Sequence, residues 1–398
     1  MRTTVSPSPH RKTWDATVRV TGGHPQQLWG IGEAQVSAEG PQLRVDRVMV
    51  HDAGQRTVGY AQLYLRSQAE RVIAGTVQCH VHRPEDVPVV AGALADWVRE
   101  EHSAALFRFD ADTVDTPGAQ DALTAAGFER RGAAGAAASG ARRLQVRLGE
   151  SERDLSCRLS ERTLQRCRAA LRTPGVTVRE VTAQSGVLAH VGLRTRLIDR
   201  LLEDLGEDSL LLVATEVGDD GSETALGYLW FVHTGGLAMI YRLGFTRRGR
   251  DLALDDALLL TGVVELQKRG VRTLDGGDPA EPDVPLVVRE LAEAQCPVLG
   301  TWEKQLGSGR AGELTGTADG ADATDAAVER TGTAVAAELG LEDPAPAGPA
   351  GPVDAAPPSG PVPGDGTGPD GGRARRVSVL TRRLVGEGLS ALRNAAGR

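Results

Sequence analysis

The residues that could do covalent chemistry follow none of the common catalytic spacings. No serine lies in a G-x-S-x-G turn, which argues against the nucleophile elbow of many hydrolases. The glycine-rich stretches match neither a P-loop nor a dinucleotide-binding fingerprint. His80 and His82 share one face of a strand-like run, but no third ligand follows at a suitable spacing, so we expect no metal site. The four cysteines are scattered, which is typical of a reducing compartment and argues against a zinc ribbon.

Arginine is the residue type whose spacing does suggest a function. Residues 151–172 read as one long helix that carries several arginines, among them Arg162, Arg166 and Arg168. Guanidinium groups pair well with phosphate oxygens, so this helix is a candidate contact for RNA or for a diphosphate. The alternative is a solvated helix face whose charges support one another at i,i+4 spacing.

The elements that must position these residues follow a mixed pattern in the first half of the chain. Alternating apolar and polar residues predict strands over 13–20, 43–51, 58–66 and 71–82. A helix over 85–102, a strand over 106–110 and a helix over 116–126 follow. We expect a strand over 143–148 to close this half.

The second half repeats the order. A strand over 176–181 leads into a helix over 187–205, and strands over 209–217, 223–233 and 237–246 form a meander with glycine-containing turns. Helices over 252–269 and 285–295 flank a strand over 271–274. A three-strand meander followed by a helix, a strand and a helix, present twice, predicts a tandem α+β architecture.

Composition separates three other segments from this body. Residues 1–12 are expected to be a flexible N-terminus. Residues 308–372 are rich in Pro, Gly and Ala, and eleven acids stand against two arginines without apolar periodicity, which predicts a disordered acidic linker. Residues 373–398 hold seven arginines and one acid, with apolar residues at helical spacing, which predicts a basic amphipathic segment. The net charge of -8 excludes a generally basic protein that coats nucleic acid.

Six short stretches carry a resemblance to a known family. They are 26–33 (QQLWGIGE), 58–62 (VGYAQ), 123–128 (LTAAGF), 162–180 (RTLQRCRAALRTPGVTVRE), 240–245 (IYRLGF) and 274–277 (LDGG). In this order they resemble the Fem-type (FemABX) peptidoglycan-bridge aminoacyltransferases, which are tandem GNAT-like acyltransferase domains. The resemblance spans about residues 20–307 and implies a first GNAT-like domain over 13–150 and a second over 151–307.

The resemblance also implies a site. Trp302 and Lys304 stand near the family's Phe-Lys pair, although Glu303 occupies the Lys position itself. Lys304 would then place positive charge near the developing oxyanion, in a cleft of the second domain. The implied catalytic residues are Lys304, Asp275 and Tyr241. The implied contacts are Arg196, Arg248 and Trp302 for the substrate, and Arg162, Arg166 and Arg168 for tRNA or phosphate.

The activity that the resemblance implies is transfer of an amino acid from aminoacyl-tRNA, without a cofactor, to the amine of a lipid-linked or nucleotide-linked peptidoglycan precursor. One alternative is an acetyl-CoA-dependent GNAT N-acetyltransferase. The segment 246–251 lacks the spacing of the loop that binds the coenzyme A pyrophosphate, and the Asp251 carboxylate would repel it. The other alternative is a non-catalytic binding paralogue, which Glu303 favours. The expected location is cytoplasmic, with peripheral contact at the inner membrane face through 373–398.

We expect the basic segment 373–398 to bind anionic vesicles weakly and reversibly, because each Lys or Arg near such a surface contributes about 1 kcal/mol. Co-sedimentation with anionic vesicles should fade as salt rises, since screening shortens the range of the attraction. Equal sedimentation with neutral and anionic vesicles would contradict this prediction.

Overall fold

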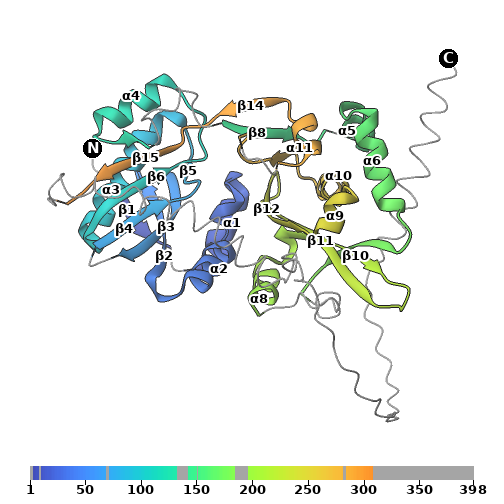
Figure 1. The fold of residues 1–398 in the computed structure, drawn as a ribbon. Helices are drawn as coiled ribbons and strands as arrows, with labels where there is room; N and C mark the ends of the chain where they lie inside the picture. Colours follow the sequence, from blue (N-terminus) through green and yellow to red (C-terminus); the bar gives the residue numbers. More distant parts are fainter. Residues whose placement is uncertain are drawn as a thin grey trace, which may run out of the picture.

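The computed structural model describes residues 3–8, 10–68, 71–131, 142–149, 151–183, 196–280 and 284–307. Helices and strands alternate through these residues and form two lobes, each built around one mixed sheet (Figure 1). The α+β prediction is therefore confirmed. The predicted linker 308–372, the basic segment 373–398 and the first part of the helix predicted over 187–205 lie outside the described residues.

The sheet of the first lobe joins strands from both ends of the chain. Its order is β1 (Thr4–Pro7), β2 (Leu43–His51), β3 (Thr57–Gln68), β4 (Arg71–Thr76), β6 (Ala104–Asp110), β15 (Thr301–Gln305) and β7 (Glu129–Arg130), and β5 (His80–Val81) pairs with β3. Strand β1 lies within the segment 1–12 that we expected to be flexible. It pairs with β2 in antiparallel register, so that expectation was wrong for these residues.

The sheet of the second lobe has the order β14 (Ala294–Pro297), β8 (Arg142–Arg147), β13 (Thr273–Asp275), β12 (Leu237–Phe245), β11 (Glu223–His233), β10 (Ser209–Val217) and β9 (Val176–Val181). Strands β9 to β12 form the predicted antiparallel meander. Strand β13 runs parallel to β12, and β8 runs antiparallel to β13.

The two lobes exchange strands. Strand β8 follows the first lobe in the chain but pairs with β13 and β14 of the second. Strand β15 follows the second lobe but lies between β6 and β7 of the first. The prediction that 143–148 closes the first half was therefore wrong: this strand belongs to the second sheet, and residues 301–305 take its place in the first.

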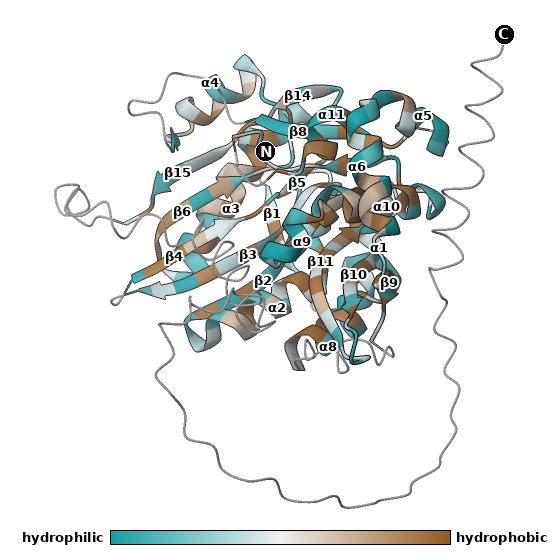
Figure 2. Ribbon diagram, turned by 45° about the vertical axis from the view of Figure 1, so that its right-hand side comes forward, coloured by the Kyte–Doolittle hydropathy of each residue, from teal (hydrophilic) through white to brown (hydrophobic). Residues whose placement is uncertain are grey.

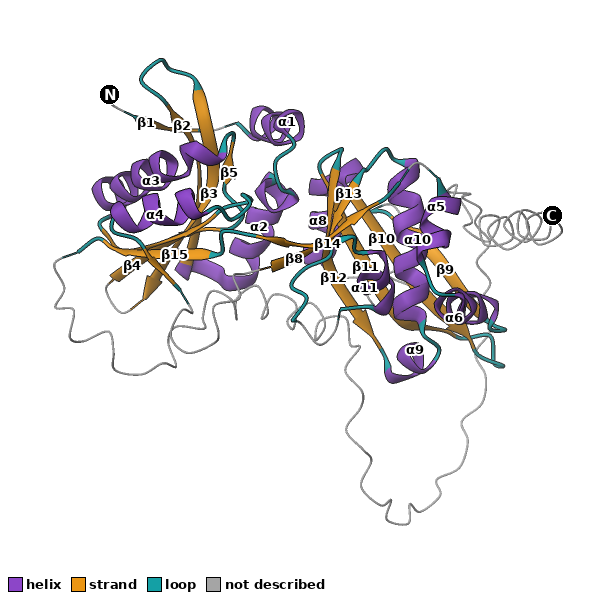
Figure 3. Cartoon of the chain, turned by 90° about the horizontal axis from the view of Figure 1, so that it is seen from above, coloured by secondary structure: helices purple, strands orange, loops and turns teal. Residues whose placement is uncertain are grey.

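Three hydrophobic cores hold the fold together. The first lobe packs helices α3 (Val87–His102) and α4 (Pro117–Ala125) on one face of its sheet, around Phe107, Phe109 and Trp302. The second lobe packs α6 (Glu161–Arg172), α10 (Leu254–Lys268) and α11 (Leu286–Leu291) on its own outer face. The third core lies between the sheets, where α1 (Arg11–Thr21), α2 (Trp29–Glu39) and α8 (Arg196–Leu205) meet (Figure 3).

Helix α1 replaces the strand predicted over 13–20. Trp14 and Val18, four residues apart, are both buried, whereas Val20 is 86% exposed, so the apolar residues follow a helical period and not a period of two. The β-branched residues that suggested a strand include Thr17. Its hydroxyl donates to the Thr13 carbonyl at 2.9 Å, which accommodates it within a helix.

The long helix predicted over 151–172 is two helices, α5 (Glu152–Arg158) and α6. The chain turns at Ser160, whose side chain accepts from the Thr163 N–H and caps α6. The helix predicted over 285–295 likewise ends early, at Leu291, and strand β14 follows. Hydropathy shows the difference between covered and exposed helices: the exposed α5 and α9 (Arg247–Asp251) are mainly hydrophilic, while the covered α10 is mainly hydrophobic (Figure 2).

None of the helices that the structure describes combines the length and the apolar character needed to cross a bilayer.

The strand exchange makes a prediction for truncations. A chain ending at residue 307 should melt at about the same temperature as the full chain, whereas one ending at 300 should lose about 10 °C, because it lacks β15 and the buried Trp302, which is only 3% exposed. Calorimetry of both truncations checks this. Equal melting temperatures would show that β15 adds little to the first lobe.

Candidate functional site

Each lobe has a β-bulge at the corresponding place in its central strands. In the first lobe, Leu63 on β3 opposes Thr76, and Tyr60 opposes His80. The two β3 residues are three positions apart and their partners are four apart, so the partner strand holds one extra residue. In the second lobe the adjacent residues 230 and 231 oppose 242 and 240, so Tyr241 is the extra residue. A bulge redirects side chains and ends regular pairing, which makes both positions candidate sites.

In the first lobe the strands beyond the bulge are closed. The Cys79 N–H donates to the Asp110 carbonyl at 2.8 Å, and the Asp112 N–H donates to the Cys79 carbonyl at 3.0 Å. The side chain of Gln78, whose φ of 55° lies in the left-handed region, donates to the Asp110 carboxylate at 3.0 Å. Strands β4 and β6 therefore stay joined, and no chain can enter between them.

In the second lobe the strands separate. Strand β13 pairs with β12 only from Leu237 to Met239. Beyond Asp275 the chain follows β8 instead, since the Gly276 N–H donates to the Leu144 carbonyl at 2.8 Å. Within the described residues, the edge of β12 from Ile240 to Phe245 has no strand beside it on this side. The result is an open strand edge inside a sheet, with Tyr241 and Asp275 on its two sides.

The loop between α1 and α2 joins the lobes beside this opening. Gln27 donates to the Val77 carbonyl at 2.5 Å, and its own side-chain oxygen accepts from the Gln62 N–H at 2.8 Å. On the other side, the Thr234 hydroxyl donates to the Gly23 carbonyl at 2.7 Å. A side chain at Gly23 would meet the Tyr60 hydroxyl at 1.9 Å, so only glycine fits there. The loop is thus fixed to both sheets.

His24, in this loop, binds the Asp275 carboxylate of the second lobe. Its Nδ1 accepts from the Gln26 N–H at 3.2 Å, so the ring hydrogen lies on Nε2 and is donated to Asp275 at 3.1 Å. Arg143 donates to the same carboxylate at 2.5 Å. Burial acts to raise the pKa of Asp275, but the His24 hydrogen bond and the Arg143 charge outweigh it and hold that pKa well below its ordinary value.

Asp110 is the corresponding carboxylate at the end of β6 in the first lobe. Burial raises its pKa, although the Arg143 charge and the hydrogen bonds from Gln78 act in the opposite direction. The two carboxylates therefore occupy similar places in the two lobes with opposite electrostatics. The surroundings of Asp275 stabilise its charged form, whereas burial destabilises the charged form of Asp110.

Two of the predicted catalytic residues flank the opening, and the third does not. Tyr241 is the bulge residue of β12, and its hydroxyl has no partner among the described residues. Asp275 is already engaged by His24 and Arg143. Lys304 lies on β15 in the first lobe, with its Nζ 5.2 Å from the Phe128 ring centroid. Trp302, on the same strand, is buried in the first core.

The five residues expected to meet in one cleft lie on four elements, β12, α9, β13 and β15, of which only β15 carries two of them. No hydrogen bond, ion pair or ring contact joins any two of Tyr241, Arg248, Asp275, Trp302 and Lys304, all of which the structure describes. Glu303, which holds the family's Lys position, pairs with Arg108 at 2.8 Å. The physical reason is the strand exchange, which places β15 in the other sheet.

Of the arginines predicted to contact substrate (Arg196 and Arg248) or phosphate (Arg162, Arg166 and Arg168), those whose side chains the structure describes are not joined to Tyr241 or Asp275. Arg248, on α9, pairs with Glu216 at 3.1 Å and stays more than half exposed. Arg196 begins α8, and its side chain lies outside the described part. On α6, Arg162 is exposed, while Arg166 and Arg168 make long ion pairs of 3.4 and 3.8 Å with Asp256 and Glu161. Figure 1 places α6 on the outer side of the second lobe.

Several polar residues near the opening were not identified from the sequence. Arg242 follows Tyr241 on β12, and Tyr228 lies on the neighbouring β11. Tyr64 and Arg47 come from β3 and β2 of the first lobe. Only Arg242 had a usable signal, since it lies within the family-like stretch 240–245. The others come from distant parts of the chain, and no spacing connects them.

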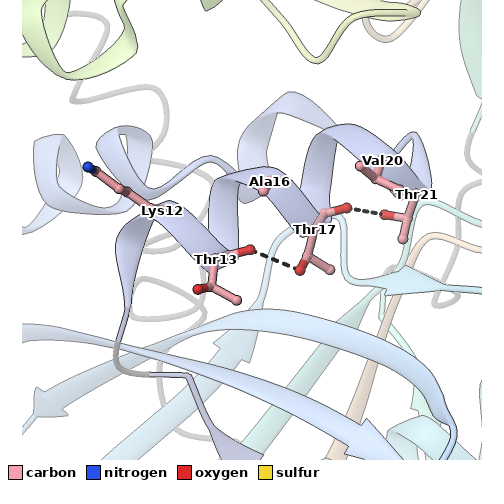
Figure 4. A pocket seen from close by; sticks show the side chains of 6 residues that line it. All are labelled: Lys12, Thr13, Ala16, Thr17, Val20 and Thr21. Carbon is pink, nitrogen blue, oxygen red and sulfur yellow. Dashed lines mark hydrogen bonds between the residues drawn. The ribbon is translucent and has the colours of Figure 1, made fainter.

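Two further features carry no acyl-transfer chemistry. His80 pairs through Nδ1 with Asp112 at 2.8 Å, but no cluster of three or more His, Cys, Asp or Glu side chains among the described residues could hold a metal ion. A shallow hollow lies along the exposed face of α1 (Figure 4). The described residues lining it are Lys12, Thr13, Ala16, Thr17, Val20 and Thr21.

Comparison with solved structures identifies the fold. FemX is 14% identical with a TM-score of 0.60, and the match covers 77% of this chain and 97% of that one. A tandem GNAT protein from the clavulanic acid biosynthesis pathway is 16% identical with a TM-score of 0.46, covering 77% and 100%. L-PGS from Bacillus licheniformis is 12% identical with a TM-score of 0.42, covering 70% and 78%. The last two are too distant to support an argument.

The likeness to FemX confirms the fold expected from the sequence, two GNAT-like lobes in tandem with Fem-type similarity. It extends over both lobes and nearly the whole of FemX. No family model and no curated protein matches the sequence.

The pKa of Asp275 is lowered and that of Asp110 is raised, so substitutions of the two should affect stability differently. Asp275→Asn should destabilise the protein by about 1–3 kcal/mol at pH 7, because Arg143 loses its charged partner. A carboxyl with a lowered pKa stabilises the fold above its ordinary pKa of about 4 and loses that contribution as pH falls through the lowered value. Stability of this variant should therefore fall less steeply on acidification than that of the wild type.

Asp110→Asn is the matched control. Since the pKa of Asp110 is raised, protonation near and above pH 4 stabilises the wild type, so the variant should be about as stable at pH 7 and fall more steeply on acidification. Urea unfolding at pH 7, 5 and 3.5 measures both slopes. Equal destabilisation by the two substitutions would contradict the assignment.

Proposed function

We propose that this protein is a Fem-type N-acyltransferase that moves an amino acid from aminoacyl-tRNA to an amine of a peptidoglycan precursor. The proposal rests on the tandem GNAT-like fold shared with FemX and on one observation within it. That observation is the open edge of β12, which only the second lobe offers.

An open strand edge suits a reaction between extended, amide-containing molecules. Unpaired backbone groups of Ile240–Phe245 can bind an extended chain as an added strand, which fixes its position without a dedicated side-chain pocket. An aminoacyl ester is already an activated donor. The enzyme therefore needs mainly to hold the acceptor amine against the ester carbonyl and to stabilise the negative charge that develops on it.

Tyr241 is the residue best placed to stabilise that charge. Burial raises the pKa of its hydroxyl, so the group stays protonated at neutral pH and can donate a hydrogen bond. The bulge turns it toward the first lobe beside the open edge. In the proposed step the amine attacks the ester carbonyl, the C–N bond forms, the ester C–O bond breaks, and the amine proton leaves as the ribose hydroxyl is regenerated.

Acetyl-CoA remains the second candidate donor, but the geometry before α10 disfavours it. A pyrophosphate needs free N–H groups at a helix start. Here the Thr246 hydroxyl already accepts from the Gly249 N–H at 3.1 Å, and a Cβ at Gly249 would meet the Leu226 carbonyl at 2.3 Å, so this turn is tightly closed.

The exposed arginines of α6 are proposed to contact the tRNA. Arg162 is exposed, and Arg168 makes only a long ion pair with the exposed Glu161, so both can turn toward phosphate at small cost. Arg166 is paired at 3.4 Å with Asp256, which is buried, so it would contact phosphate while keeping this pair. The acceptor is proposed to approach from the first lobe, across the loop that carries His24. Contact of the segment 373–398 with an anionic membrane would bring the enzyme to a lipid-linked acceptor.

A transfer assay tests the proposal. Purified protein is incubated with a mixture of charged tRNAs and with nucleotide-linked or lipid-linked wall precursors, and amide products are identified by mass spectrometry. We expect product from charged tRNA and none from acetyl-CoA. Tyr241→Phe should lower kcat by about 10²-fold, as expected for loss of one donor to the oxyanion.

Lys304→Ala is the discriminating control. Because its Nζ already lies over the Phe128 ring in the first lobe, we expect the rate to stay within about twofold. A large loss with Lys304→Ala and none with Tyr241→Phe would move the site to β15. Absence of transfer from every charged tRNA and acyl-CoA would favour a non-catalytic binding protein.

A further inference from the structure

Arg242 is a half-buried cation that has no carboxylate partner among the described residues. Its guanidinium carbon lies 4.8 Å from the centroid of the Tyr241 ring, and Nη1 donates to the Tyr241 carbonyl at 3.1 Å. No ion pair to Arg242 occurs among the described residues. Its Nε is buried and has no hydrogen-bond partner.

Other buried arginines of the protein do have such partners. Arg47 pairs with Glu33 at 3.0 Å, and Arg108 pairs with Glu303 at 2.8 Å. Removing a charge from water is costly unless a partner compensates it, so native structures rarely leave one alone. Arg242 departs from this pattern at the open edge of β12, where a ligand could supply the missing charge.

Further hydrogen-bonding groups around Arg242 are also without partners. The hydroxyls of Tyr228 and Tyr64 are buried and unpaired, and these residues are only 2% and 7% exposed. The Arg47 Nε is likewise unpaired. A Cβ on Gly244 would lie 3.2 Å from the Tyr228 hydroxyl, so this hydroxyl reaches across β12 beside Arg242.

The groups belong to one neighbourhood. Burial raises the pKa of Tyr228 to about 12 although the Arg242 charge acts to lower it. Burial likewise raises the pKa of Tyr64, against the effect of Arg47, and the nearby Tyr241 acts on it too. Geometry places them together as well: Tyr64 shares one face of the first sheet with Tyr60, and Tyr60 packs with Tyr241 in the core between the two lobes. The Arg47 guanidinium lies over the ring of Trp29, which packs against the same core. Tyr64 and Arg47 come from the first lobe, and Tyr228 and Arg242 from the second. All can donate hydrogen bonds, and Glu33 already neutralises Arg47, which leaves one net positive charge.

We infer that Arg242, Tyr228 and Tyr64 form a binding site for an oxyanion, a phosphate or a carboxylate group, between the two lobes. The anion would accept from the Arg242 Nε and from one or both hydroxyls. Donors from both lobes would meet on it, so binding would also hold the lobes together. This inference concerns binding alone and stands whether or not the protein transfers an amino acid.

Titration calorimetry of the full chain at constant ionic strength tests it, with inorganic phosphate, pyrophosphate and acetate as probes. We expect one saturable site, and the stronger of the phosphate and acetate arms identifies the kind of group. Arg242→Gln should weaken binding by about 10- to 100-fold, the loss expected for a charged hydrogen bond. Tyr228→Phe and Tyr64→Phe should each weaken it by a smaller factor.

Arg56→Gln is the control, since Arg56 lies in the turn between β2 and β3, is exposed and is paired with Asp52 at 2.7 Å. The affinity of this variant should be unchanged. Equal effects of the Arg242 and Arg56 substitutions would overturn the inference, because binding would then be non-specific surface attraction. So would the absence of saturable binding, which would mean that water alone satisfies these groups. Arg242→Lys keeps the charge and should retain part of the affinity. This variant shows whether the loss in Arg242→Gln comes from the missing charge or from misfolding.

Discussion

The exchange of β8 and β15 is the constraint on which the rest of the structure depends. Each sheet is completed by a strand that lies next to the other lobe in the chain, so neither sheet is complete with its own residues alone. Strand β15 inserts between β6 and β7, and Trp302 brings a large side chain into the first core. Strand β8 likewise separates β13 from β14. The lobes are therefore joined by backbone hydrogen bonds as well as by packing.

The exchange of β8 also determines which charged groups meet between the lobes. Arg143 lies on the exchanged strand β8, and His24 lies on the loop between α1 and α2. Both converge on Asp275, at the point where β13 leaves β12. The same strand separation opens the β12 edge, while Gln78 and Asp110 keep the corresponding strands of the first lobe closed. Two lobes with similar topology thereby differ in one respect: among the described residues, only the second leaves a strand edge inside its sheet unpaired.

Sequence reasoning predicted the element order and the tandem fold because hydrophobic periodicity is a local property. The meander over β10, β11 and β12 and helix α10 followed from it directly. It did not predict the strand exchange, since the pattern of 143–148 is the same whichever sheet the strand joins. Helix α1 was missed because its β-branched residues resemble a strand, although Trp14 and Val18 follow a helical period. The resemblance named Tyr241 and Asp275 as site residues but did not predict the opening between their strands, and the Arg242 neighbourhood depends on contacts between distant residues.

During synthesis on the ribosome, the strand exchange delays completion of the first sheet. Strand β6 ends at Asp110, but its partner β15 begins only at Thr301. At about 5–20 residues per second, a ribosome needs roughly 10–40 s to reach that partner. Throughout this interval the nascent first lobe exposes an unpaired edge of β6 and an apolar space that Trp302 will fill. An edge of this kind can pair with another chain, so the first lobe is open to aggregation until β15 emerges and covers it.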